Sequence, residues 1–510
     1  MMRLEDRFNL IDEPWIPVTE VGLVSLKQLF SEPFYRSLGG SPIDKIALTK
    51  FLLAIAQTAD TPESDEDWVM LTPEKLAREC LSYLEERHDL FYLYGDRPFL
   101  QMPAIRNSEL KPFGSTIPGI AAKPVMKGKQ INTTILFQSE IEKNLTDGEK
   151  ALLIVRLMGC ALGGKQTDNS IVLSPGYTGK TNESGKKSSG KEGPFIGAIG
   201  YLHTFLQGNS LWETLWLNLF SRQYILGLGA YPDGVGTPPW EEMPTGEDCS
   251  IAKRLKSTLM GRLVPLSRFC LLEENGLYYS EGIAYPGCNE GGRDPSVSRA
   301  SSGKNLKVLW TDPLKRPWRS LPSILSFVHE GGNKGFECYQ IRLLGRAREK
   351  VEIVGIWSGG LRVKNTAGEQ KVAESCDFVE SLVWIPCKDF GTLAFLRLSE
   401  EMNQLENLSN KTFAAILNYF KDQKIDNAKQ QTSQAMSLFW QLCEQRFQDL
   451  LNACIDTDLA ESVRLSFTKI AERIYNMYCP RETSRQIEVW AKNRPDFRWY
   501  FPGKEKGKND

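Results

Sequence analysis

The chain has 510 residues, of which 41% are hydrophobic and 25% are charged, and this composition excludes wholesale disorder, collagen and coiled-coil architectures. Its 62 basic and 63 acidic residues give a net charge of −1, which excludes a uniformly basic nucleic-acid coat but allows locally basic patches. A chain of this length can bury a large core without disulfides or metals.

The first hundred residues contain signals for two long helices and for short strands. Apolar and turn residues around Trp15 predict one or two strands near the N-terminus. Apolar residues at helical spacing predict a core helix over 44–59. Thr72 followed by Pro73 is typical of a helix start, with Thr as the N-cap and Pro in the first turn. The aromatic stretch 91–103 predicts a packed loop and a short strand.

Two long irregular segments flank a helix that is predicted over 146–162. Residues 112–138 are rich in Gly and Pro and hold three lysines without an acid between them. Irregular stretches of more than about 15 residues are usually functional or disordered. The second segment, 163–193, centres on five glycines, four lysines and two glutamates. Such a loop is typical of a solvated linker, but also of a backbone that approaches phosphates or a groove, where glycine removes the obstructing Cβ.

A basic segment follows in the second half of the chain. A strand is predicted over 262–274, with a turn after it. Residues 299–319 then hold six bases against one acid, which is the clearest electrostatic footprint in the sequence, although a solvated basic face has the same composition. Trp318 lies between Arg316 and Arg319. An aromatic ring there could stack on a base or wedge a duplex, or it could belong to the core.

The last part of the chain is helical in pattern. Four amphipathic stretches with short connections predict an antiparallel four-helix bundle, over 390–420, 432–454, 460–477 and 483–492. The predicted fold class is therefore α+β, with a mixed N-terminal domain over 1–387. The bundle occupies 388–510 and ends in a short frayed tail.

Motifs of most enzyme classes are missing from the sequence. The eleven cysteines include no C-x-x-C pair, only three histidines occur, and no phosphate-binding loop or nucleophile elbow is present. We therefore predict no catalytic residues, no metal site and no cofactor. The sequence also shows no secretory signal and no apolar run near 18 residues, which predicts a cytoplasmic protein with no membrane contact.

Several segments, in this order along the chain, resemble one family. They are FNLIDEPWIPV, FYLYGDRPFLQ, TPPWE, PWRSLPSIL and FWQLCEQRFQDLL, between residues 8 and 451. Together they resemble the CasA family, the large subunit of the type I-E CRISPR Cascade complex. The resemblance implies a non-catalytic subunit that reads a protospacer-adjacent motif in double-stranded DNA, mainly from the minor groove. It further implies strand separation at the start of an R-loop and recruitment of a helicase-nuclease in trans.

The resemblance also implies partners and contact residues. The partners are the crRNA 5′ handle, the target DNA, the helicase-nuclease, and the guide-capping, backbone and small subunits of the complex. A loop toward the RNA handle matches Lys127, Lys129, Asn132, Phe137 and Gln138. A glycine loop for the minor groove matches Gly185, Lys186, Lys187, Gly190 and Lys191. A duplex-opening wedge falls near Arg316, Trp318, Arg319 and Ser320, and the basic segment before it adds Lys304 and Lys307.

Two other functions remain open from the sequence. One is a purely structural scaffold of a ribonucleoprotein complex, in which the basic loops are only solvated. The other is a metal-dependent nuclease, which needs clustered His, Asp or Glu residues. Only scattered acids such as Asp65, Glu66 and Asp67 are present, and these are expected on a loop.

Overall fold

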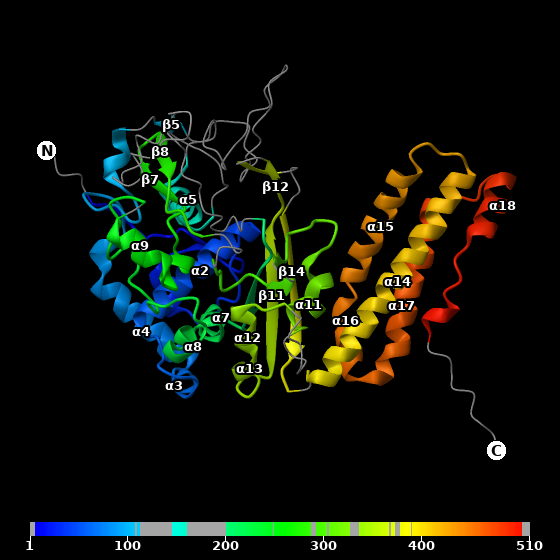
Figure 1. Ribbon diagram of the computed structural model, residues 1–510, viewed down its shortest axis with the longest axis horizontal. Coiled ribbons are helices and arrows are strands. Elements are labelled where there is room, and N and C mark those ends of the chain that lie inside the picture. The colour runs from blue at the N-terminus through cyan, green and yellow to red at the C-terminus, as the bar shows by residue number, and fades with distance from the viewer. Residues whose placement is uncertain are drawn as a thin grey trace. The chain divides into compact units, whose positions relative to one another are not determined.

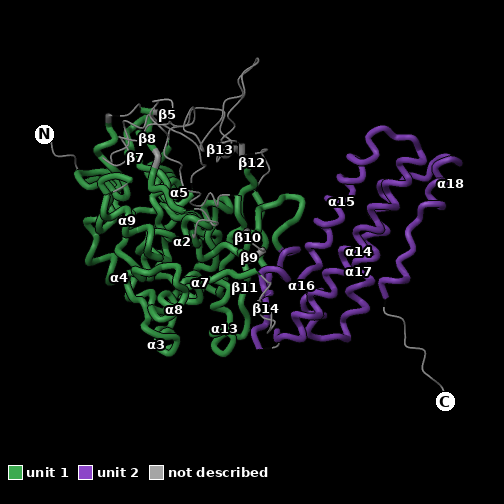
Figure 2. Tube along the Cα trace, in the orientation of Figure 1, with its two compact units in different colours: residues 1–317, 336–382 green, residues 318–335, 383–510 purple. Residues whose placement is uncertain are grey.

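The structure is a computed structural model that describes residues 6–107, 110–112, 145–160, 200–247, 249–286, 292–302, 305–326, 336–366, 369–372, 378–388 and 390–501. The chain forms two compact units (Figure 2). Unit 1 comprises residues 1–317 and 336–382, and unit 2 comprises residues 318–335 and 383–510. Helices and small sheets mix in unit 1 and helices dominate unit 2, which confirms the predicted α+β class (Figure 1).

Helix α2 (Pro42–Ala59) is the centre of unit 1 and is buried along nearly its whole length. Ser41 and Asp44 begin it with a reciprocal capping box. The other α-helices that the structure describes in unit 1 are α1 (Leu26–Ser31), α3 (Asp65–Met70), α4 (Pro73–Glu86), α5 (Asp147–Gly159), α7 (Leu211–Asn218), α8 (Arg222–Gly227), α9 (Ser250–Lys256), α10 (Met260–Leu263), α12 (Tyr339–Arg342) and α13 (Leu344–Ala347). Helices α4, α5 and α7 pack on α2. The predicted helix over 44–59 and the predicted Thr72 cap are confirmed.

The strands of unit 1 form several small sheets. The largest have three strands, in the orders β14–β11–β6 and β5–β8–β7. Their members are β5 (Lys111–Pro112), β6 (His203–Gln207), β7 (Arg268–Leu272), β8 (Gly276–Glu281), β11 (Ile353–Leu361) and β14 (Phe378–Pro386), and the last four residues of β14 belong to unit 2. The two-stranded sheets are β1 (Arg7–Asn9) with β4 (Tyr92–Tyr94), β2 (Ile16–Val18) with β3 (Gly22–Val24), β9 (Arg299–Ser302) with β10 (Asn305–Val308), and β12 (Val363–Thr366) with β13 (Glu369–Val372). Strand β11 packs against α2 and is almost entirely buried.

The strand predicted over 262–274 is wrong at its start. Residues up to Leu263 belong to α10, and the strand β7 begins only at Arg268. Between them Leu266 has a φ of 52°, in the left-handed region that an extended strand does not contain. The apolar run therefore turns before it joins the sheet.

Unit 2 is a helical bundle, as predicted. It contains α14 (Thr392–Asp422), α15 (Ala428–Glu444), α16 (Phe447–Ile455), α17 (Ala460–Tyr478) and α18 (Ser484–Asn493), together with the short α11 (Leu321–Ile324). Helices α14, α15 and α17 pack on one another (Figure 1). Each contributes buried side chains, among them Leu405, Phe439 and Phe467. The single helix predicted over 432–454 is instead two, α15 and α16. In the part of the chain that the structure describes, no helix is both long and apolar enough to cross a membrane.

Candidate nucleic-acid interface

Most of the predicted nucleic-acid contacts lie outside the described residues. These are Lys127, Lys129, Asn132, Phe137 and Gln138 of the handle loop, Gly185, Lys186, Lys187, Gly190 and Lys191 of the glycine loop, and Lys304. Their roles stay predictions. The structure describes the residues on either side of these segments.

Helix α5 connects the two segments that carry the predicted loops. It is preceded by 113–144 and followed by 161–199. The side chain of Thr146 accepts a hydrogen bond from the backbone N–H of Glu149, and the carboxylate of Glu149 accepts one from the backbone N–H of Thr146, so the start of α5 is fixed. The helix packs on α2 and is buried on most of its surface. One core helix thus holds one attachment point of each loop.

Buried charges strengthen this region of unit 1. Arg156 of α5 forms an ion pair with Asp44 of α2, and both side chains are buried. Lys50, less than two turns after Asp44 on α2, has its Nζ 2.5 Å from Oδ2 of Asp294. Oδ1 of Asp294 accepts a hydrogen bond from Ser296 Oγ at 2.8 Å, and that hydroxyl lies 2.8 Å from Nδ1 of the buried His203. The two ion pairs join residues 112 and 244 positions apart, so local sequence patterns give no signal for them.

The pKa of Asp294 reflects this environment. Burial by itself raises the pKa, but the charges of Lys50 and His203 and the hydrogen bonds from Lys50 and Ser296 outweigh it and lower the pKa to about 2. Asp294 is therefore ionised at neutral pH and compensates the charge of Lys50. A buried cation with this compensation does not need a ligand to neutralise it.

Three arginines of the predicted basic segment are engaged within the protein. Arg299 lies 3.5 Å from Glu337, with its guanidinium over the ring of Tyr339. Arg316 donates to the backbone oxygen of Glu380 at 3.3 Å. Lys307 and Lys315, by contrast, have exposed side chains.

Arg319 is the third of these arginines, and it lies in unit 2. Its guanidinium lies 2.6 Å from Glu406 and 3.6 Å from the ring centroid of Trp440. Because these three arginines interact within the protein, the surface of the segment is less basic than its composition indicates.

Trp318 of the predicted wedge is buried in unit 2, with 2% of its surface exposed. Its ring centroid lies 4.7 Å from that of Phe447 and 5.8 Å from that of Trp440. Ser320 is buried as well. A ring held in this way cannot reach a base while unit 2 keeps this structure, so the core alternative is favoured for Trp318.

Three of the five motifs that resemble the CasA family meet in one aromatic cluster of unit 1. Phe51 of α2 lies 5.8 Å from Trp15, 5.8 Å from Phe99 and 5.6 Å from Trp240, measured between ring centroids. Phe91 lies 5.1 Å from Phe99. Three of the quoted segments thus contribute rings to a shared core. The packed loop predicted over 91–103 is confirmed, and these motifs specify the fold rather than a contact with nucleic acid.

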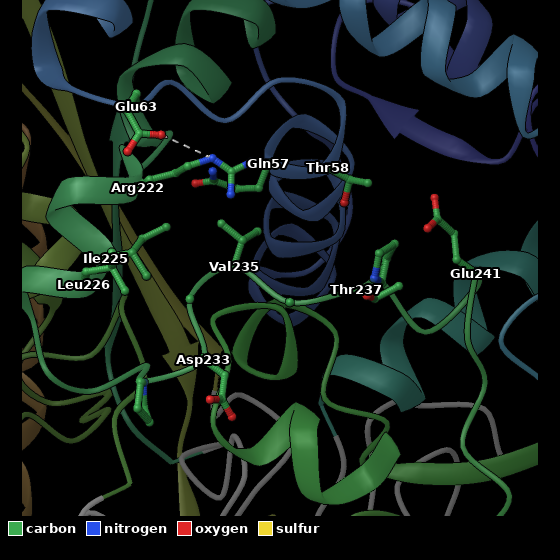
Figure 3. A pocket seen from close by; sticks show the side chains of 14 residues that line it. Gln57, Thr58, Glu63, Arg222, Ile225, Leu226, Asp233, Val235, Thr237 and Glu241 are labelled. Carbon is green, nitrogen blue, oxygen red and sulfur yellow. Dashed lines mark ion pairs between the residues drawn. The ribbon is translucent and has the colours of Figure 1, made fainter. Parts of the chain in front are cut away.

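A cavity of about 540 Å³ lies in unit 1 (Figure 3). Its walls come from α2, α8 and residues 232–238, and on one side of it Arg222 and Glu63 form an ion pair with 3.7 Å between Nε and Oε2 (Figure 3). Glu241 at its rim accepts a hydrogen bond from Tyr83 at 2.7 Å. Within the described ranges no three His, Cys, Asp or Glu side chains gather as metal ligands would. The cavity contains paired charges but no arrangement of a nucleophile with a base.

Comparisons with known proteins agree with the resemblance. The family model of the CRISPR-associated protein Cse1 matches residues 9–476. A CRISPR-associated protein CasA/Cse1 of Thermus thermophilus is 27% identical over 346 residues, which are 63% of this chain and 60% of that relative. The chain thus aligns with less than two thirds of the length of this relative.

Solved structures are similar over nearly the whole chain. The crystal structure of Thermus thermophilus CasA has 19% identity and a TM-score of 0.67, and the alignment covers 96% of this chain and 98% of that one. Thermobifida fusca Cse1 has 17% identity and a TM-score of 0.66, with 96% of each chain covered. A chain of a CRISPR RNA-guided surveillance complex has 15% identity and a TM-score of 0.65, with 96% and 98% covered. At these identities the structures show a shared fold. Since the family model spans most of the sequence, this chain belongs to the CRISPR-associated Cse1 family, the CasA family that the sequence motifs indicated.

Proposed function

We propose that this chain is the large, non-catalytic subunit of a crRNA-guided antiviral surveillance complex in the cytoplasm. In this role it recognises the protospacer-adjacent motif in double-stranded DNA, helps to destabilise the duplex and start the R-loop, and recruits a helicase-nuclease. The observation that carries the proposal is the likeness, over 96% of this chain, to a chain of a CRISPR RNA-guided surveillance complex. Family membership over residues 9–476 supports the same role.

Minor-groove recognition fits the composition of the glycine loop. The minor groove distinguishes mainly A·T from G·C pairs, so a reader there needs close backbone approach rather than long base-specific side chains. Gly185 and Gly190 allow that approach, while Lys186, Lys187 and Lys191 hold phosphates and set the register. Sequence specificity along the rest of the target is then left to base pairing with the guide.

The partners follow from the same role. The handle loop, with Lys127 and Lys129, contacts the crRNA 5′ handle beside the guide-capping subunit, and the backbone and small subunits complete the complex. A net charge of −1 suits a subunit whose affinity for nucleic acid is supplied largely by its partners. Lys307, which is exposed on β10, adds a phosphate contact among the described residues.

A nuclease is the weaker alternative, because the acids that suggest it have structural roles. Asp67 caps α3 together with Ser64. Asp65 lies 2.9 Å from Arg346, whose guanidinium also covers the ring of Trp68. A magnesium-dependent cleavage assay of the purified chain on naked DNA tests this alternative, and we expect no cleavage.

The decisive experiment compares the guide-loaded complex assembled with and without this chain. The probe is duplex DNA with a matched protospacer and a randomised flanking trinucleotide, and the bound DNA is sequenced after a gel shift. We expect binding that requires the chain and an enrichment of a few flanking motifs. Binding that is independent of both chain and flank contradicts the recognition role and favours the scaffold.

A further inference from the structure

Trp310 differs from every other tryptophan of the chain. All twelve tryptophans are among the described residues, and Trp310 alone is exposed, with 48% of its surface accessible. It belongs to the same basic segment as Trp318, which is buried. The aromatic side chain that this segment presents to solvent is therefore Trp310.

The backbone around Trp310 is firmly held. Tyr201 and Trp310 form an antiparallel bridge. On either side of it, Leu202 N donates to Leu309 O and Thr311 N donates to Gly200 O, both at 2.8 Å. The exposed indole is thus presented in a fixed orientation, which lowers the entropy lost when a ligand binds to it.

One side of the indole rests on unit 1. The ring of Tyr201 meets it edge-on, with 4.5 Å between the centroids. Gly200 lies so close that a Cβ there would come 2.7 Å from Cζ3 of the indole, and 2.7 Å from Val363. Glycine at 200 is what allows the ring to lie this close to the backbone, and 48% of the surface of Trp310 remains accessible.

The surroundings of Trp310 along the chain favour an anionic polymer as the ligand. Lys307 and Lys315 are exposed on either side of it, against the single exposed acid Asp312. Gly200, which touches the indole, directly follows the segment 161–199 that contains the predicted glycine loop. An aromatic face flanked by lysines is the arrangement by which proteins bind unpaired nucleotides, where stacking adds about 1–3 kcal/mol per base.

We propose that Trp310 is a stacking platform for one unpaired base of the target DNA, beside the flanking motif. The inference rests on the proposed function, since a base becomes available for stacking only where the duplex opens. Lys307 and Lys315 hold the neighbouring phosphates. These contacts with the protein stabilise the opened duplex until base pairing with the guide replaces the base pairs that were lost.

The test measures binding of the assembled complex to a matched target that carries an accepted flank, using Trp310→Ala and Trp310→Phe. We expect Trp310→Ala to weaken binding about 5- to 150-fold, and Trp310→Phe, which keeps a π-face, to stay within about threefold of the unsubstituted chain. The slope of affinity against salt concentration should not change, because the lysines that hold the phosphates remain in place. Phe34→Ala is the matched control, because it removes another exposed ring of unit 1. If Trp310→Ala impairs folding, Trp310→Leu replaces it, as an apolar side chain without a π-face.

An abasic nucleotide, moved stepwise along the target strand and the opposite strand next to the flank, identifies the stacked base. At that position we expect the abasic nucleotide to lower the affinity of the unsubstituted complex. The affinity of the Trp310→Ala complex, which already lacks the stacking contact, should not fall further. Unchanged affinity of Trp310→Ala, or the absence of any coupled position, overturns the inference. A defect in complex assembly instead of DNA binding assigns the ring to a protein partner and overturns it as well. If flank-dependent binding persists in these cases, the proposed function stands without the platform.

Discussion

Lys50 and Asp294 form an ion pair inside unit 1, with 2.5 Å between Nζ and Oδ2, although 244 positions separate them in the sequence. The side chain of Lys50 is completely inaccessible and that of Asp294 is 10% exposed. The pair joins α2 to the segment that leads into β9, next to the buried His203. A buried pair of this kind fixes one arrangement of the elements it joins, because each charge is costly without the other.

Removing one member of the pair should therefore destabilise unit 1. For Lys50→Met we expect a loss of roughly 3–5 kcal/mol, since Asp294 is left buried without a cation. The matched control is Lys45→Met, which breaks the partly exposed pair with Glu380 on the same helix and should cost at most about 1 kcal/mol. The denaturant midpoint of each variant measures the effect. Equal midpoints for the two variants would show that the buried ion pair contributes no more to stability than the partly exposed one.

The same pair predicts how stability depends on pH. Burial alone raises the pKa of Asp294, but Lys50 and His203 lower it to about 2, below the value near 3.9 of an unfolded chain. A lowered folded pKa stabilises the folded state above the unfolded pKa, and this contribution is lost as the pH falls from about 4 to about 2. We expect the advantage of the unsubstituted chain over Asp294→Asn to shrink by roughly 2 kcal/mol across that range. An advantage that stays constant from pH 6 to pH 2 would contradict the assignment.

Trp318 allows packing and wedge roles to be separated by experiment. Because its ring is buried against Phe447 and Trp440, Trp318→Ala should destabilise unit 2 by about 3–5 kcal/mol. Trp318→Phe should keep much of that stability and leave DNA binding by the complex unchanged. Thermal unfolding and gel shifts on the same preparations measure both properties. A variant of Trp318 that keeps full stability but fails to open the duplex would restore the wedge interpretation.

The sequence predicts helices and strands well where residues close together in the chain determine the backbone conformation. The cap at Thr72 and the apolar spacing of α2 required no knowledge of distant residues. Leu266 shows the limit, because apolar residues continue through it while its φ of 52° ends the extended conformation. The break between α15 and α16 likewise lies within a continuous helical pattern.

The candidate site was harder to predict, because exposure depends on tertiary packing. Trp310 and Trp318 belong to one basic segment and have the same chemistry, yet one is exposed and the other buried. The arginines of that segment attract distant acids and tyrosines, as Arg319 does with Glu406, and so lose their availability to phosphates. Composition counts these charges but cannot show which of them are already paired.

The lysines of the predicted glycine loop provide the clearest separation between a groove reader and a scaffold. Reversing Lys186, Lys187 and Lys191 to Glu should abolish most DNA binding by the assembled complex. It should also reduce the slope of log affinity against log salt, by about 0.9 for each phosphate that the loop no longer neutralises.

The control for this reversal must change the net charge by the same amount at exposed sites elsewhere. Lys27, Lys75 and Lys350 meet that condition, because their side chains are exposed on described parts of unit 1. Their reversal to Glu lowers the long-range attraction between the complex and DNA equally, but leaves every predicted DNA-binding residue in place. If both triple variants weaken binding alike, the effect is one of net charge, and the loop has no specific role. If neither variant changes binding, the scaffold becomes the better account of this subunit. A defect confined to the loop variant, with guide loading intact, is the outcome that the minor-groove proposal requires.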